Sequence, residues 1–167
     1  NQIAKRYNIP TYSTGGMSDS KTSDYQAAVE KSLQALTVAL AGGNYIHNAA
    51  GILDFSMTCS YEQYIIDNEM LGMVIRVLQN FAVNQDTLSV DQIKEIGPGG
   101  NFMGLMHTLT HLKNEHYIPE LFNRSTYDSW LNSGGRDIKE IAKEKAKDIL
   151  KYHRVEPLPN EVKEELN

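Results

Sequence analysis

Apolar residues recur every three or four positions in several segments of the chain, which is the spacing of one buried face of an α-helix. Helices are predicted on this basis over residues 23–41 and 60–82. Their apolar faces consist of Val29, Leu33, Leu36 and Leu40 in the first helix, and of Ile66, Met70, Met73, Val77 and Phe81 in the second. Both helices, and a shorter one that ends before Gly97, begin with serine followed three residues later by glutamine, the spacing of a capping box. The three pairs are Ser23 with Gln26, Ser60 with Gln63, and Ser89 with Gln92.

Two short segments between these helices are typical of buried β-strands. They span residues 10–14, ahead of the first helix, and 44–48, between the first helix and the second. The order strand, helix, strand, helix predicts βαβ units with parallel pairing and a right-handed crossover. Two parallel strands alone leave two open edges and make too little sheet for a stable domain. We therefore expect the chain to be part of a larger α/β structure.

After Gly97 the sequence predicts mostly helix, over residues 104–116 and 137–152. The apolar face of the last helix consists of Ile138, Ile141, Ala142, Ala146 and Ile149. Lysine and glutamate alternate on its other face, which we interpret as a solvated surface with weak ion pairs.

Composition narrows the class of protein. The chain has 167 residues, of which 41 % are apolar and 22 % charged, and its formal net charge is -5. This balance is typical of a folded domain and disfavours binding to nucleic acid or to an anionic membrane. The single cysteine, Cys59, cannot form an intrachain disulfide, and the sequence contains neither a signal peptide nor a run of ~20 apolar residues. A cytoplasmic location is expected. Because the sequence starts at Asn1 within the end of a helix pattern, we also expect a truncated chain.

Candidate functional residues lie in the two loops that follow the predicted strands, because parallel α/β proteins place their sites there. The first loop, residues 14–21, contains Gly15-Gly16 and Asp19. The second, residues 47–56, starts with His47 and continues with small residues, which leave room for a ligand. The alternatives are a plain strand-to-helix turn for the first loop and a hydrogen-bonded core histidine for the second.

A possible metal site lies in the predicted helix over residues 104–116. His107, His111 and Glu115 are spaced four apart and share one face, which suits zinc. The glutamate that follows the first histidine of metalloprotease helices is missing. An amphipathic helix whose histidines pack or pair is the favoured interpretation, and a small metal-binding or scaffold module is the alternative function.

The sequence itself resembles a known family over nearly its whole length. The segments GGMSDSKTSDYQAAVEKSLQALTVALAGGNYIHNAAGIL, SYEQYIIDNEM and GPGGNFMGLMHT are similar to the C-terminal part of the trimethylamine methyltransferase family. The resemblance implies an α/β fold, namely the C-terminal portion of a TIM (β/α)8 barrel that is rich in helix and contains only a few parallel strands. Residues 1–97 would form the last βα units of the barrel, and residues 98–167 a C-terminal helical region packed on it.

The resemblance also implies a reaction. A methyl group would move from a tertiary or quaternary methylamine, such as trimethylamine or a betaine, to the cobalt(I) of a cognate corrinoid protein. The cobalamin is carried by that partner, so no cofactor is expected to bind this chain directly, and no metal ligands are assigned. The implied catalytic residues are Asp19 and His47. The substrate-binding residues are Tyr12, Asp54 and Phe55, and the residues facing the corrinoid are Gly15, Gly16, Asn48 and Gly51.

The substrate remains open at this stage, because some family members use pyrrolysine and others lack it. No such residue is present here, but the chain starts close to the region concerned. Without the rest of the barrel we expect no catalysis by this segment alone. Its open strand edges and apolar faces predict a homo-oligomer.

Overall fold

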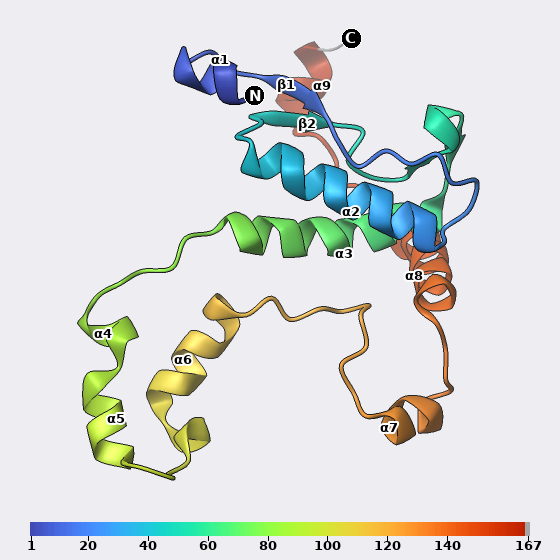
Figure 1. The fold of residues 1–167 in the computed structure, drawn as a ribbon. Helices are drawn as coiled ribbons and strands as arrows, with labels where there is room; N and C mark the ends of the chain where they lie inside the picture. The colour runs from blue at the N-terminus through green and yellow to red at the C-terminus, as the bar shows by residue number, and fades with distance from the viewer. Residues whose placement is uncertain (166–167) are drawn as a thin grey trace.

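The computed structural model describes residues 1–165 and contains a small α/β part and a helical lobe (Figure 1). A short helix, α1 (Gln2–Arg6), leads into strand β1 (Tyr12–Thr14). Helix α2 (Tyr25–Leu40) connects it to β2 (Tyr45–His47), and the strands pair in parallel with Ser13 opposite Ile46. The predicted βαβ unit is therefore confirmed.

A second, antiparallel pair of strands follows directly and was not predicted. Strands β3 (Ile52–Leu53) and β4 (Thr58–Cys59) are joined by the short 3-10 turn η1 (Asp54–Ser56). Helix α3 (Tyr61–Leu78) then lies against α2 (Figure 1). Two small sheets and two packed helices thus form the α/β part.

Helix α2 begins one residue later than its capping pattern predicts. Asp24, not Ser23, is the N-cap, and its carboxylate accepts a hydrogen bond from the Ala27 N–H. Because a carboxylate at this position satisfies a free backbone donor and faces the positive end of the helix dipole, it caps better than the neighbouring hydroxyl.

The predicted apolar face of α2 is not its buried face. Its buried residues are Ala27, Lys31 and Ala35, whereas Val29, Leu33 and Leu40 are 58–59 % exposed. Small residues let α2 approach its neighbours closely, and no described element covers the larger side chains. Of the predicted apolar face, Leu36 packs against the core, whereas the prediction is wrong for Val29, Leu33 and Leu40 in the chain on its own.

Helix α3 supplies most of the small hydrophobic core. Met70 and Val74 are buried against Ala35 of α2. Ser60 caps the helix as predicted, since its Oγ accepts from the Gln63 N–H, but the Gln63 side chain donates to Asp67 and does not complete the predicted capping box. The helix ends at Leu78, so Phe81 lies beyond it and is exposed, in contrast to the prediction.

The helical lobe consists of α4 (Gln85–Leu88), α5 (Val90–Ile96), the 3-10 turn η2 (Phe102–Gly104) and α6 (Met106–Glu115). Its capping box is formed by Asn84 and Thr87, while Ser89 adopts a left-handed conformation and makes no capping hydrogen bond. The proposed domain boundary at residue 97 falls within this lobe, between α5 and η2. The division of the chain into 1–97 and 98–167 stays a prediction.

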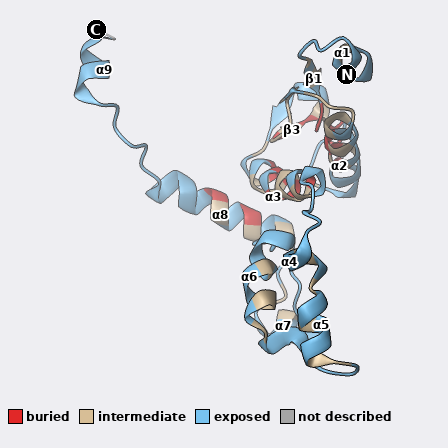
Figure 2. Ribbon diagram, turned by 90° about the vertical axis from the view of Figure 1, so that its left-hand side faces the viewer, coloured by how far each residue is buried: buried red, intermediate tan, exposed pale blue. Residues whose placement is uncertain are grey.

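Up to residue 165, where the described part of the chain ends, three more helices follow: α7 (Tyr127–Asn132), α8 (Ile138–Tyr152) and α9 (Asn160–Glu165). Asp137 and Glu140 form a complete capping box at the start of α8, which packs against α3. Figure 2 shows that the buried residues of α8 do not extend beyond its middle, that its C-terminal part is exposed, and that α9 stands away from the sheets. Ala142 and Ala146 are buried, whereas Ile149 of the predicted apolar face is exposed.

Within residues 1–165, the structure shows no helix with the length and apolar character that a membrane crossing requires.

Candidate functional site

The two loops that follow β1 and β2 lie against each other. The N–H groups of Asp54 and Phe55 donate to the carbonyl oxygens of Ser20 and Ser18, at 2.9 and 3.1 Å. At Gly16, where φ is +80°, the place of a side chain is filled by the Ala49 backbone, 2.6 Å from an added Cβ. The predicted loops are thus brought together by main-chain contacts.

A buried lysine on α2 donates hydrogen bonds to the main chain of both loops. The Lys31 side chain is 1 % exposed, and its Nζ donates to the carbonyl oxygens of Gly16 and Ile52, the latter at 2.8 Å. One bond reaches the first loop and the other reaches the second. Lys31 was not among the predicted site residues, because a lysine within an apolar helix pattern suggests a solvated position.

The counter-charge of Lys31 is Asp67 on α3. Its Oδ2 lies 3.2 Å from the Lys31 Nζ and accepts from the Gly51 N–H at 2.8 Å, while its Oδ1 accepts from the Gln63 Nε2 at 2.7 Å. Burial raises the pKa of Asp67 above its ordinary value, and Lys31, Gln63 and Gly51 offset part of this effect. Because the acceptors and donors around this pair are largely matched, it serves as a rigid support for the loops.

Aromatic side chains line the face of the parallel pair that points away from α2. The Tyr12 and Tyr45 rings are stacked with centroids 5.0 Å apart, and the His47 ring lies 5.3 Å from that of Tyr12. On the opposite face, Ile46 and Val38 of α2 both lie within 3.5 Å of the Cβ position of Gly15. Tyr45 was not among the predicted site residues, although the two-residue alternation along a strand places it on the same face as His47.

His47 ends β2 and is half-buried. Its Nδ1 atom is enclosed and has no hydrogen-bond partner within residues 1–165. An unpaired buried nitrogen is uncommon in proteins and calls for an explanation. The alternative prediction of a hydrogen-bonded core histidine is therefore not what the structure shows.

The two predicted carboxylates differ in their surroundings. The Asp19 side chain is exposed, while its main chain is held by the Glu30 carboxylate, which accepts from the Asp19 N–H at 3.0 Å. Hydrogen bonds, the largest from Ser18, keep the pKa of Glu30 below its ordinary value. Asp54 is half-buried and pairs with Lys21 at 3.5 Å.

Phe55 sits at the tip of η1, in a run of three left-handed residues. The φ angles of Asp54, Phe55 and Ser56 are 49°, 49° and 72°, and the Phe55 side chain is 73 % exposed. Left-handed conformations are costly for residues other than glycine and occur disproportionately at functional loops. This strained turn presents an aromatic ring to solvent beside the first loop.

The residues predicted to face a corrinoid are mostly enclosed. Gly15, Gly16 and Gly51 are buried, and a Cβ on Gly51 would lie 2.3 Å from the Tyr64 ring. Asn48 is half-buried, with its amide nitrogen 3.9 Å from the Met17 sulfur. Close packing thus accounts for the glycines, and their role toward a partner stays a prediction.

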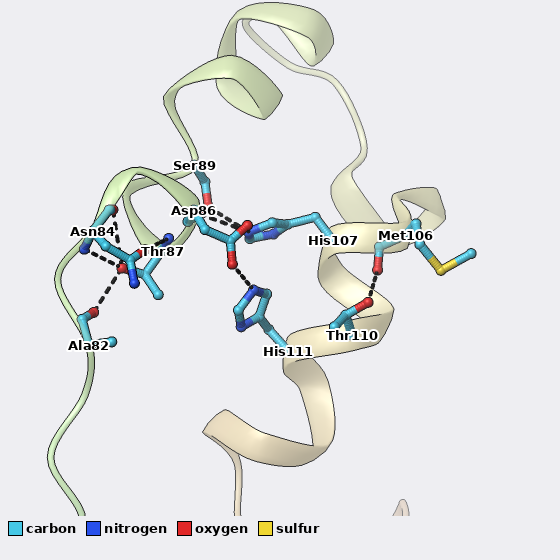
Figure 3. A network of polar contacts seen from close by, with 9 residues as sticks. All are labelled: Ala82, Asn84, Asp86, Thr87, Ser89, Met106, His107, Thr110 and His111. Carbon is cyan, nitrogen blue, oxygen red and sulfur yellow. Dashed lines mark hydrogen bonds and ion pairs between the residues drawn. The ribbon is translucent and has the colours of Figure 1, made fainter.

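The helical lobe contains a second cluster of polar groups (Figure 3). The Nε2 atoms of His107 and His111 on α6 lie 3.4 and 2.9 Å from the two carboxylate oxygens of Asp86 on α4. Glu115, the predicted third member, instead forms an ion pair with Arg76 at 2.9 Å. Both histidines thus pair with a carboxylate, in agreement with the favoured interpretation, whereas Glu115 lies outside their cluster.

Comparison with known proteins supplies the remaining evidence. The family model "Trimethylamine methyltransferase (MTTB)" matches residues 1–167. The chain is 38 % identical to trimethylamine methyltransferase MttB of Methanosarcina thermophila over 161 residues, which is 96 % of this chain and 33 % of that protein. It is 39 % identical to MttB2 of Methanosarcina mazei, over 96 % of this chain and 32 % of that protein.

A relative with a different name is equally similar. The glycine betaine methyltransferase of Desulfitobacterium hafniense is 40 % identical over 129 residues, or 77 % of this chain and 27 % of that protein. The chain spans about a third of the length of the curated relatives it matches. A match over all 167 residues, together with these identities, shows that the chain belongs to the trimethylamine methyltransferase family.

Proposed function

We propose that this chain is the C-terminal portion of a TIM-barrel methyltransferase, with β1 and β2 as two adjacent barrel strands. In such a barrel, helices cover the outer face of the strands and side chains of the other face fill the interior. The parallel pair agrees with this, because Ile46 faces α2 whereas Tyr12, Tyr45 and His47 face away from it. The exposed apolar face of α2 would then contact elements outside this chain.

The proposed reaction moves a methyl group from a tertiary or quaternary methylamine to the cobalt(I) of a cognate corrinoid protein. The carbon–nitrogen bond breaks, nitrogen keeps the electron pair, and cobalt supplies the electrons of the new bond to the methyl group. The protein contributes chiefly by binding and orienting the amine and by excluding water from it. Under this proposal the enzyme is cytoplasmic, and the segment by itself is inactive.

The observation that carries this proposal is the stacked pair of Tyr12 and Tyr45 next to His47. A methylated ammonium group is bound favourably over aromatic faces, because the ring quadrupole attracts a cation. Both tyrosines are more than half exposed, at 67 % and 60 %, so their outer surfaces are available to a ligand or to the barrel interior.

His47 is proposed to orient the amine or its substituents from the end of β2. The enclosed Nδ1 atom has no hydrogen-bond partner, so a hydrogen there would have no acceptor. The tautomer with its hydrogen on Nε2 is therefore favoured. The ring then acts as a hydrogen-bond donor on its accessible side. Asp19 and Asp54 supply negative charge in the adjoining loops, and the pairing of Asp54 with Lys21 leaves Asp19 as the stronger candidate for attracting a cation.

Contact with the corrinoid protein is proposed for the exposed rim of the same loops. The predicted glycines offer no open cradle, because neighbouring atoms fill the places of their side chains at Gly16 and Gly51. Asn48 and the exposed Phe55 remain as side chains that a partner can reach. Phe55 is thereby moved from substrate binding to this rim in our proposal.

The test uses the full-length protein that contains this segment, with methyl transfer to the corrinoid protein as the readout. Tyr12→Leu and Tyr45→Leu should each raise KM for trimethylamine or glycine betaine about 2- to 30-fold, the range of a cation–π contact. Tyr25→Leu is the matched control, because Tyr25 is 93 % exposed at the start of α2 and is not part of the stacked pair of rings. Comparing both amines in each variant also identifies the preferred substrate. Kinetics equal to those of the control in both tyrosine variants would contradict the proposed binding face.

A further inference from the structure

The cluster of Asp86, His107 and His111 joins two helices that are far apart in the sequence. Asp86 lies on α4, and both histidines lie on α6, 21 and 25 residues later. One ligand atom from each residue can be chosen so that all three lie within 4.8 Å of one another. Figure 3 shows both imidazole rings pointing from α6 toward the Asp86 carboxylate. Their ring centroids are 4.4 Å apart.

We propose that Asp86, His107 and His111 form a binding site for a zinc-like divalent cation that joins α4 to α6. Two imidazole nitrogens and one carboxylate oxygen are a common set of protein ligands for such an ion, and an open fourth position is left for water. Residues spaced four apart on a helix lie on one face, so α6 presents both nitrogens together. The carboxylate oxygen comes from α4, so the protein supplies three of the four ligands of a tetrahedral site.

The existing contacts are compatible with replacement by a metal ion. The His111 Nε2 lies 2.9 Å from the Asp86 Oδ2, and the His107 Nε2 lies 2.9 Å from the Asp86 carbonyl oxygen. Since carboxylate and carbonyl oxygens only accept, each Nε2 carries a hydrogen in this arrangement. To bind a cation, each ring would present an unprotonated Nε2 to it and carry its single N–H hydrogen on Nδ1.

The surroundings of the cluster leave space for an exchangeable ligand. A hollow of about 370 Å³ adjoins it, lined by residues of α6 and of the segment that follows α3. The imidazoles themselves are only 20 % and 25 % exposed, so an ion there would be partly shielded from bulk solvent. Water or a small anion in the hollow can therefore complete the coordination.

The lobe also lacks another strong means of holding its helices together. In α4, α5 and α6, all within the described part of the chain, no residue is fully buried. Small units without a hydrophobic core are commonly stabilised by a structural metal, because binding free energy then contributes to folding. A cation that bridges α4 and α6 supplies that connection.

The experiment measures Zn²⁺ content and Co²⁺ absorption of the full-length protein after removal of metal with a chelator and reloading. The parent should bind one Zn²⁺ more than His107→Gln, His111→Gln or Asp86→Ala, and each variant should bind Zn²⁺ on the order of 100-fold more weakly or worse. The Co²⁺-loaded parent should show the visible absorption of a four-coordinate ion, and the variants should lose it. This spectrum requires no variant and so tests the site even where a substitution impairs folding.

Two matched controls distinguish this site from others nearby. His116→Gln changes a histidine that lines the same hollow but lies outside the cluster, and Glu115→Gln changes the carboxylate that pairs with Arg76. Both should keep the additional Zn²⁺ and the Co²⁺ spectrum. Equal Zn²⁺ content in the parent and the three cluster variants, or a Co²⁺ spectrum without four-coordinate absorption in the parent, would overturn the proposal.

Discussion

Replacing Lys31 by methionine should destabilise the protein strongly, because it removes one member of a buried ion pair. The side chains of Lys31 and Asp67 are 1 % and 2 % exposed. Loss of one partner leaves the Asp67 carboxylate buried without its counter-charge and removes the donor from the carbonyl oxygens of Gly16 and Ile52. Breaking a buried pair in this way typically costs about 3–5 kcal/mol. The lost carbonyl bonds are part of that figure and are not added to it.

The stability of the Lys31→Met variant should depend on pH in a direction that can be measured. Burial already raises the pKa of Asp67, and removing the Lys31 ammonium raises it further. A raised folded-state pKa favours folding at low pH, and this contribution is lost as pH rises through the folded value. Lowering the pH from about 7 to about 5 should therefore restore part of the lost stability in the variant.

The assay is chemical unfolding of the full-length protein, with a double-mutant cycle. Asp67→Asn in the Lys31→Met background should recover part of the loss, since an amide can still accept from the Gly51 N–H without a buried charge. Lys21→Met is the matched control: its ion pair with Asp54 is solvent-exposed, and it should change the free energy of unfolding by less than about 1 kcal/mol. A loss below about 1 kcal/mol for Lys31→Met, or an equal loss at both pH values, would refute this reasoning.

Three further changes test the loops and the helix start. Gly16→Ala should lower the free energy of unfolding by about 1–3 kcal/mol, and the melting temperature with it, because φ is +80° and no room is left for a Cβ. Gly104→Ala, where a Cβ would lie in open space, should leave both unchanged. The hydrogen bond from the Ala27 N–H lowers the pKa of Asp24 below its ordinary value. The Asp24 carboxylate therefore stabilises the fold at neutral pH, and this contribution is lost as pH falls through the pKa of the folded state. Thermal melts of Asp24→Asn should lack this sensitivity to acid. His47→Ala should slow methyl transfer on the order of 100-fold without earlier melting, since Nδ1 has no hydrogen bond to lose; early melting at the parent rate would exclude a catalytic role.

Much of the local structure follows from sequence patterns, because helix starts and strand ends depend on neighbouring residues. Ser60 caps its helix as predicted, and the parallel pair of β1 and β2 follows from the order of elements. The capping residue of α2 differs by one position, since Asp24 competes with Ser23 and makes the better acceptor. Such competition cannot be judged from spacing alone.

The buried face of α2 could not be predicted from periodicity. Apolar spacing identifies a helix, but which side is covered depends on the elements that lie beside it. Here Lys31 is buried because its three acceptors come from two loops and from α3, all distant in sequence. The exposed leucines on the other side would be covered under the proposed barrel.

The two candidate sites differ in which of their residues could be predicted from the sequence. Tyr45 could have been found, because it stands two residues before His47 on the same strand. Asp86 could not, since it meets His107 and His111 only through the packing of α4 on α6. Spacing along one helix therefore suggested Glu115, which the structure places with Arg76 instead.

The way Lys31 holds the loops bears on how substrate preference can change during evolution. Its ammonium group contacts main-chain oxygens of both loops and no loop side chain. Neither bond depends on which amino acids the loops carry at those positions, apart from the glycine that the left-handed turn at Gly16 requires. Side chains along the rim can therefore be exchanged while the loop backbones keep their positions. Under the proposed function, one scaffold could acquire selectivity for different amines by substitutions in the loops alone.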